Sequence, residues 1–162
     1  MFKLIKKIFI LILIIIILVC SFITYEGYSM YKEVISKESI EKKVEKIKKY
    51  DNYISISEVP ETYKNATIAI EDHRFYSHGA IDVFTTARSF IENIRNKELS
   101  NGGSTITQQV ARNMYFTQEK SFIRKVAELF VAVDLEKNYS KDEILEMYLN
   151  IIYFVDGYTG LK

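Results

Sequence analysis

A carboxylate at residue 71 is the first candidate for chemistry in this sequence. Glu71 directly follows the apolar pair Ala69-Ile70, and His78 comes seven residues later. A carboxylate at the end of an apolar helical run, which we expect to be partly buried, can act as a general base or acid. The alternative is a surface ion pair with Arg74, three residues further on.

A glycine pair followed by hydroxyl and amide side chains forms a second candidate site at residues 102–109. Glycines ahead of a hydroxyl-capped helix leave backbone N–H groups exposed at the positive end of the helix dipole, which suits a phosphate or a sugar hydroxyl. The alternative is an ordinary loop with a capping serine. The candidate substrate-binding residues here are Gly103, Ser104, Thr105, Gln108 and Gln109.

A third segment is basic and contains one well-placed carboxylate. Arg124 and Glu128 are four residues apart, so both project from one face of a helix. Arginine and lysine together suit a diphosphate ligand. The alternative is an exposed salt bridge, which contributes about 0.3–0.5 kcal/mol. The basic residues of this candidate site are Arg112, Lys120, Arg124 and Lys125.

Helices must position these segments, because apolar residues recur at helical spacing from residue 61 onward. We predict helices near 62–70, 82–94, 121–137 and 141–150, the last of which we interpret mainly as a core helix, and a further helix that begins after Ser104 or Thr105. Asp82 is the expected N-cap of the helix at 82–94, Ser104 or Thr105 of the next and Ser121 of the one after, and Gln108 is the capping-box partner of Thr105. Ser140 and Glu143 form a capping box for the last helix. The sequence shows no alternation of strands and helices, so the predicted fold class is all-α.

The apolar faces of two of these helices should point inward. For 82–94 they are Phe84, Ala87, Ile91 and Ile94, and for 121–137 they are Phe122, Val126, Phe130 and Val133.

The N-terminus predicts a membrane anchor. No charged side chain occurs from Ile8 to Tyr25, and about 20 apolar residues in a helix cross a bilayer core of about 30 Å. Lys3, Lys6 and Lys7 precede the segment, so the positive-inside rule places the N-terminus in the cytoplasm and the rest outside, as a single-pass protein of the cell membrane. A cleaved signal peptide and a lipid anchor on Cys20 are weaker alternatives, since small residues are missing at the required positions.

Residues 26–58 are rich in lysine and glutamate and should form a stalk and connector between the anchor (residues 1–25) and the domain (residues 59–162). Ile40, Val44 and Ile47 give this segment a thin apolar stripe on an otherwise solvated helix.

Composition excludes several classes of protein. The 162 residues carry a formal net charge of +1, which argues against a nucleic-acid partner. One cysteine excludes a disulfide scaffold and a cysteine-based zinc site.

The candidate segments, with the helix at 144–150 as the fourth, resemble glycosyltransferase family 51 in their order and spacing. This family is the peptidoglycan glycosyltransferase domain of class A penicillin-binding proteins and monofunctional transglycosylases. The string Gly-Gly-Ser-Thr-Ile-Thr-Gln-Gln at 102–109 is the most specific match. The resemblance implies a helical domain that is partly lysozyme-like. It also implies that residues 59–162 cover only part of that domain. The resemblance does not decide whether this partial domain is active.

The resemblance further implies that the enzyme polymerises lipid II into glycan strands and releases undecaprenyl diphosphate. Glu71 matches the general base, and Glu128 matches the second catalytic carboxylate, near the departing diphosphate. The matching substrate-binding residues are His78, Gly103, Ser104, Thr105, Gln108, Gln109, Arg112, Lys120, Arg124 and Lys125, with Arg112 and Lys120 exchanging the lysine and arginine expected there.

No cofactor is firmly implied, and no residue is assigned as a metal ligand. Any metal would be a loosely held hard cation, Mg²⁺ or Mn²⁺, at the diphosphate. The expected partners are lipid II, the nascent glycan strand and the bacterial cytoplasmic membrane, with cell-wall synthesis proteins as further candidates. Two other functions compete: a truncated, non-catalytic module that binds lipid II, and, with less support, a lysozyme-type enzyme that cleaves glycans.

Overall fold

The computed structural model describes residues 2–96, 102–117 and 121–152, and this part of the chain is helical, without a strand. The all-α prediction is therefore confirmed. Lys120, Phe154 and the rest of the C-terminal segment from residue 153 lie outside the described residues. The elements in chain order are α1 (Phe2–Lys37), α2 (Ile40–Ile47), α3 (Glu61–Glu71), the 3-10 turn η1 (Phe75–Ser77), α4 (Val83–Asn96), α5 (Ile106–Tyr115), α6 (Phe122–Asn138) and α7 (Lys141–Ile151).

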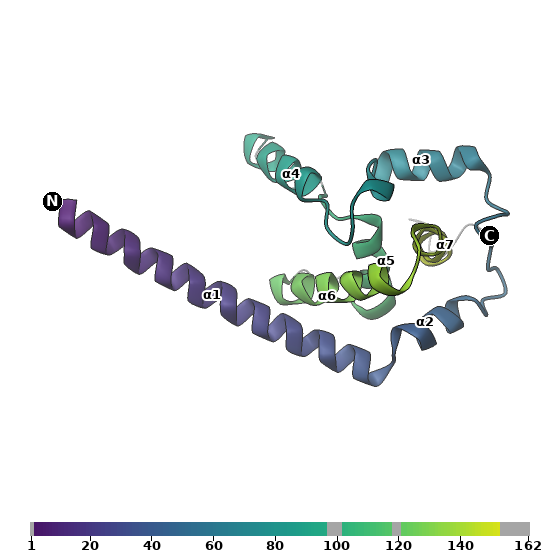
Figure 1. The fold of residues 1–162 in the computed structure, drawn as a ribbon, viewed down its shortest axis with the longest axis horizontal. Coiled ribbons are helices and arrows are strands. Elements are labelled where there is room, and N and C mark those ends of the chain that lie inside the picture. The colour runs from purple at the N-terminus through teal and green to yellow at the C-terminus, as the bar shows by residue number, and fades with distance from the viewer. Residues whose placement is uncertain (1, 97–101, 118–120, 153–162) are drawn as a thin grey trace.

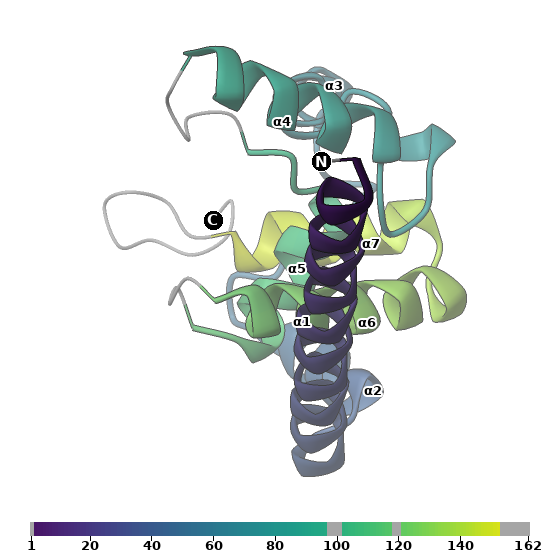
Figure 2. The same ribbon diagram turned by 90° about the vertical axis from the view of Figure 1, so that its left-hand side faces the viewer.

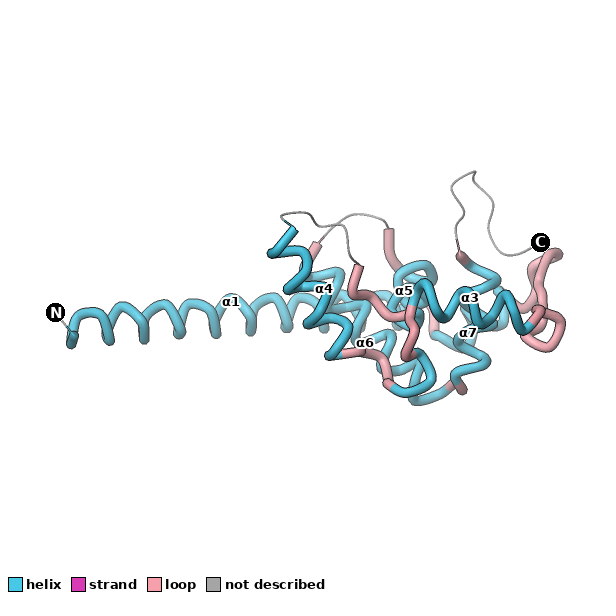
Figure 3. Tube along the Cα trace, turned by 90° about the horizontal axis from the view of Figure 1, so that it is seen from above, coloured by secondary structure: helices cyan, strands magenta, loops and turns pink. Residues whose placement is uncertain are grey.

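The N-terminal helix α1 is 36 residues long and is apolar enough in its first part to cross a membrane. At 1.5 Å per residue it measures about 54 Å, well beyond the bilayer core of about 30 Å. Its first half extends alone from the rest of the molecule (Figures 1 and 3). The apolar side chains from Ile8 to Val19 are exposed there, as a lipid-facing helix requires. A membrane-spanning N-terminal helix is thus consistent with both sequence and structure.

The second half of α1 packs against α6 (Figure 2). Gly27 is buried at this crossing, where a Cβ atom would lie 2.6 Å from the Cβ of Val126. The rings of Tyr28 and Tyr31 contact Phe130, with centroid distances of 5.2 and 5.5 Å, and the Tyr31 hydroxyl donates to Asp134. The apolar first half of α1 and the half that packs on the domain therefore form one continuous helix.

The segment predicted as a solvated stalk is partly a core element. Ile40, Val44 and Ile47 of α2 are each about 95% buried, and α2 packs against α7. The expectation of a solvated helix is wrong for these residues because their apolar stripe finds a partner far along the chain.

The core lies where α5, α6 and α7 meet. α5 packs on both α6 and α7, and Ile106, Val110, Leu135, Ile144 and Leu145 are completely buried there. α3 and α4 lie on one side of this group and α2 on the other (Figures 1 and 2). The α5–α7 group is therefore the frame on which the predicted site residues are held.

Most of the predicted helix caps are present. Asp82 Oδ1 accepts hydrogen bonds from the backbone N–H groups of Phe84 and Thr85, at 3.0 and 3.1 Å. The Thr105 hydroxyl accepts from Gln108 N at 3.2 Å, and Ser140 and Glu143 form the expected capping box. Ser121 stands at the N-cap of α6 without a side-chain cap hydrogen bond.

Four residues predicted to face inward are exposed. Phe84, Ile91 and Phe122 are 75%, 64% and 82% exposed, and Ala87 is exposed as well. The side chain of Ile94 lies outside the described residues. Phe84 and Ile91 lie on an outer face of α4 that no helix of the described chain covers, and Phe122 lies in the first turn of α6, beyond its contact with the core. Val126, Phe130 and Val133 do pack inward.

Candidate active site

Glu71 is the last residue of α3 and is exposed, so the expectation of partial burial is wrong. None of the residues of α3 is fully buried, which leaves this helix on the surface of the domain. The side-chain amide of Gln109, on α5, donates a hydrogen bond of 2.8 Å to Glu71 Oε2. The candidate base is thus accessible to solvent and is held by the neighbouring helix.

Glu128 is the buried centre of an ion-pair group on α6. It is 1% exposed and is paired with Arg124, one turn earlier, and with Lys125 Nζ at 3.2 Å from its Oε2. Lys125 Nζ also donates to the hydroxyl of Ser104 at 2.8 Å. The alternative of an exposed salt bridge is therefore wrong, because the carboxylate is withdrawn from water.

Arg112 of α5 adds a third positive charge to this group. Burial, together with the charges of Arg112 and Arg124, lowers the pKa of Lys125 to about 8. Arg112 Nε is buried and has no hydrogen-bond partner within the described chain. We call Arg112, Arg124 and Lys125 the cation cluster. Three cations against the one carboxylate of Glu128 leave the cluster with a positive excess. A bound anion would accept from Arg112 Nε and raise the pKa of Lys125 again.

Helix α5 joins the two halves of the site. Gln109, which contacts Glu71, and Arg112, which belongs to the cation cluster, are three residues apart and so lie on the same side of α5. Ser104, which contacts Lys125, directly precedes the N-cap of the same helix. The structure therefore brings Glu71, Gln109, Ser104 and the cation cluster together around one element.

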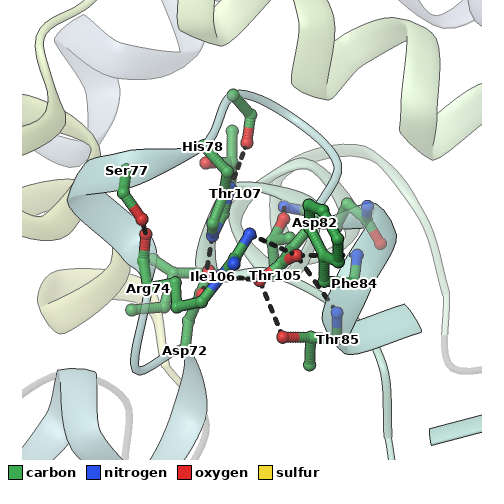
Figure 4. Close-up of polar contacts among 12 residues, drawn as sticks. Asp72, Arg74, Ser77, His78, Asp82, Phe84, Thr85, Thr105, Ile106 and Thr107 are labelled. Atoms are coloured by element: carbon green, nitrogen blue, oxygen red, sulfur yellow. Dashed lines mark hydrogen bonds and ion pairs between the residues drawn. The ribbon is translucent and has the colours of Figure 1, made fainter. Parts of the chain in front are cut away.

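A separate polar network fixes the loop that follows Glu71 (Figure 4). His78 Nε2 lies 2.7 Å from Asp72 Oδ1, and Asp72 Oδ2 accepts from the backbone N–H of Ile106 at 3.1 Å, at the start of α5. Arg74 makes two hydrogen bonds of 3.0 Å to Asp82. These contacts tie the end of α3 and the start of α4 to α5.

Three predicted substrate-binding residues lie in or beside this network. The side chain of His78 is 5% exposed, and the side chains of Thr105 and Gln108 both donate to the carbonyl oxygen of Ala80, at 3.0 and 2.9 Å. Gln108 thus does not complete the expected capping box. The structure shows these side chains engaged with protein atoms and places none of them in contact with Glu71, so their role toward a substrate stays a prediction.

Gly103 permits a close approach between two segments. A Cβ atom there would lie 3.2 Å from the Cα of Thr86, whose hydroxyl donates to the Gly103 carbonyl at 3.3 Å. The glycine therefore lets α4 pack against the segment that leads into α5.

The residues do not fit a bound divalent cation well. Possible ligand atoms of Asp72, His78 and Asp82 lie within 4.8 Å of one another, but these groups already bind one another, Arg74 and backbone N–H groups. Both oxygens of Glu128 are paired with cationic side chains. These carboxylates and this imidazole are therefore already engaged with protein groups.

Tyr148 is a residue near the site that sequence reasoning missed. Its place in the apolar stripe of α7 indicated only a core position, and it is indeed 1% exposed. It also lines a pocket of about 200 Å³ together with Glu71. The sequence signal that could have indicated a second role is the hydroxyl group, because a buried tyrosine usually makes a hydrogen bond to a polar partner.

Fold and site together define an all-α protein with an N-terminal helix able to span a membrane and an anion-attracting cluster near an accessible carboxylate. A family model described as transglycosylase matches residues 37–162. The chain belongs to this family, as the resemblance of its motifs to family 51 indicated.

The chain is similar to several bacterial cell-wall proteins. It is 46% identical over 117 residues to a monofunctional glycosyltransferase of Staphylococcus aureus strain JH9, which covers 72% of this chain and 43% of that protein. It is 46% identical over 109 residues to penicillin-binding protein 1F of Bacillus subtilis strain 168, covering 67% of this chain and 15% of that protein. With penicillin-binding protein 1A/1B of the same organism the identity is 48% over 109 residues, covering 67% and 12%. The match thus spans less than half of each of these relatives.

Proposed function

We propose that the protein is a membrane-anchored peptidoglycan glycosyltransferase that polymerises lipid II into glycan strands and releases undecaprenyl diphosphate. The observation that carries the proposal is the position of the cation cluster. Its Arg112 lies one turn of α5 after Gln109, the residue that donates a hydrogen bond to Glu71. Membership of the transglycosylase family and similarity to a protein named monofunctional glycosyltransferase support the reaction class.

Glu71 is the general base of the proposed reaction. Its carboxylate takes the proton of the acceptor sugar's 4-hydroxyl while that oxygen attacks the anomeric carbon of the growing strand. A new carbon–oxygen bond forms as the bond to the diphosphate breaks, and attack from the opposite face inverts the anomeric carbon. The exposure of Glu71 supports this role, since the acceptor must reach it from solvent.

The cation cluster takes up the leaving group. The diphosphate departs with the electron pair of the broken bond, so its negative charge grows in the transition state. Fixed positive charges therefore stabilise the transition state more than the bound substrate. In this proposal Glu128 holds Arg124 and Lys125 in place through its two ion pairs.

Helix α1 keeps the site at the bilayer, where a polyprenyl substrate is found. In the proposed topology the lysine-rich N-terminus is cytoplasmic and the domain is outside. The packing of α1 on α6, the helix that carries Arg124 and Lys125, supports a fixed relation between anchor and site.

The test is lipid II polymerisation by the full-length protein in detergent, with Lys125→Gln and, as a matched control on the same helix, the exposed Lys137→Gln. We expect glycan strands from the wild type, a loss of at least about tenfold in kcat/KM for Lys125→Gln, and no change for Lys137→Gln. Lipid II binding without polymer would instead indicate a non-catalytic module, and soluble muropeptides released from cell wall would indicate a lysozyme-type enzyme. Equal activity of the two lysine variants would contradict the role of the cluster.

A further inference from the structure

Tyr148 presents a buried hydroxyl to the pocket beside Glu71. The side chain lies on α7 and is 1% exposed, and its hydroxyl has no hydrogen-bond partner within the described chain. Glu71 and Tyr63 of α3 and Leu149 of α7 line the same pocket of about 200 Å³. The unpartnered group and the candidate base therefore border one small cavity.

An unpartnered buried hydroxyl destabilises a folded protein, because the group has given up its hydrogen bonds to water. Phenylalanine would fill the same apolar site without that loss. A tyrosine at this position is thus better explained by a partner that the hydroxyl meets during function than by packing alone.

Electrostatics support Glu71 as that partner. Burial raises the pKa of Tyr148, and the negative charge of Glu71 raises it further. Tyr63 and hydrogen bonding toward Glu71 add smaller rises, and the charge of Arg112 opposes them. The hydroxyl therefore keeps its proton at neutral pH and can act only as a donor toward a carboxylate.

We propose that Tyr148 is a positioning residue for Glu71, an inference that rests on the proposed function. Gln109 already donates to Oε2 of Glu71, which leaves Oε1 for the tyrosine. When the exposed Glu71 side chain turns toward the pocket, the Tyr148 hydroxyl donates to Oε1. An amide from α5 and a hydroxyl from α7 then fix the plane of the carboxylate, which directs its remaining lone pairs at the acceptor hydroxyl.

The first test compares Tyr148→Phe with Tyr63→Phe, a matched control in the same pocket, in the full-length protein. We expect Tyr148→Phe to lower kcat about tenfold or more with KM for lipid II unchanged, since an aligned base acts in the transition state. Its Tm should be unchanged or higher, because the variant removes an unpartnered hydroxyl. Tyr63→Phe should match the wild type in kcat. Unchanged kcat in Tyr148→Phe, or a fall in kcat that a lower Tm accompanies, would overturn the proposal.

A second readout does not depend on turnover. In protein labelled with ¹³C at the tyrosine Cζ atoms, the Tyr148 resonance is assigned by its loss in Tyr148→Phe. We expect it to shift in Glu71→Gln and to stay in place in Glu61→Gln, an exposed control at the other end of α3. An unchanged Tyr148 chemical shift in Glu71→Gln would refute the hydrogen bond between the two side chains. If the wild type makes no glycan but the resonance still shifts, the proposed function fails while the contact stands.

Discussion

The side-chain amide of Gln109 donates a hydrogen bond of 2.8 Å to the carboxylate of Glu71, across 38 residues of sequence. This contact joins the end of a surface helix, α3, to α5, a helix of the core. The same helix carries Arg112 one turn later, beside Lys125 of α6. The orientation of the candidate base is therefore set by the element that also contributes to the cation cluster.

The pKa of Lys125 predicts a loss of activity at alkaline pH. Burial and the neighbouring arginine charges lower this pKa to about 8, so Lys125 loses its positive charge as the pH rises through that value. We expect kcat/KM for lipid II to fall above about pH 8 in a pH series. In Lys125→Arg the fall should move to higher pH, because an arginine keeps its charge. If kcat/KM of Lys125→Arg falls at the same alkaline pH as that of the wild type, Lys125 is not the cause of the fall.

The same lysine has an opposite effect on stability. Unfolding returns its pKa toward the ordinary 10.5, so the unfolded chain binds more protons between about pH 8 and 10.5, and the lysine's contribution to stability rises with pH in that window. As the pH rises above about 8, kcat/KM should therefore fall while the contribution of Lys125 to the free energy of unfolding increases.

Replacing Gly27 should separate the anchor helix from α6. A Cβ at this position would lie 2.6 Å from Val126 Cβ and 3.0 Å from the Ile123 carbonyl oxygen, so Gly27→Ala forces the helices apart. We expect a loss of about 1–3 kcal/mol in the free energy of unfolding, typical of overpacking, measured by thermal denaturation in detergent. Gly79→Ala is the control, because a Cβ there meets nothing within 4 Å. Equal Tm values for the two variants would argue against the tight crossing.

The ion pair of Asp82 and Arg74 should stabilise the protein only above acidic pH. Burial alone would raise the pKa of Asp82, but hydrogen bonds from Thr85 and the charge of Arg74 outweigh it and hold this pKa well below its usual range. A depressed carboxyl pKa gives stability that is present above the unfolded value of about 3.9 and is lost as the pH falls below it.

Asp82→Asn therefore tests this network at two pH values. At pH 7 we expect the variant to be less stable by about 1–3 kcal/mol, and at pH 3 the difference from the wild type should shrink. Urea unfolding at both pH values measures this directly. A difference that is the same at pH 3 and pH 7 would show that the charge of Asp82 does not contribute.

The helices could be predicted from signals within a few residues of sequence. Contacts between residues far apart in the chain could not be predicted. The Ser140–Glu143 capping box and the Asp82 cap are encoded within a few residues, and both are present. The burial of Ile40 depends on α7, about 100 residues away, and the exposure of Phe84 depends on which helices reach α4. Periodicity gives a helix an apolar face but does not say what covers that face.

The sequence could name candidate residues for the site, but it could not give their geometry. The motif spacing pointed to Glu71 and Glu128, yet nothing in it separated an exposed salt bridge from the buried group at Glu128. His78 matched the family motif, and only the structure shows that its side chain meets Asp72. Contacts between helices, such as that of Gln109 with Glu71, have no local sequence signal.

Lipid II turnover by Glu71→Gln, measured beside lipid II binding by the same variant, tests the central claim most directly. The glutamine keeps the size of the side chain and a hydrogen-bonding oxygen for Gln109, but it cannot accept the acceptor's proton. We expect polymerisation to fall by at least about 100-fold while the Kd for lipid II stays within about twofold of the wild type, since the cation cluster is intact. A variant that polymerises lipid II at the wild-type rate would contradict the account.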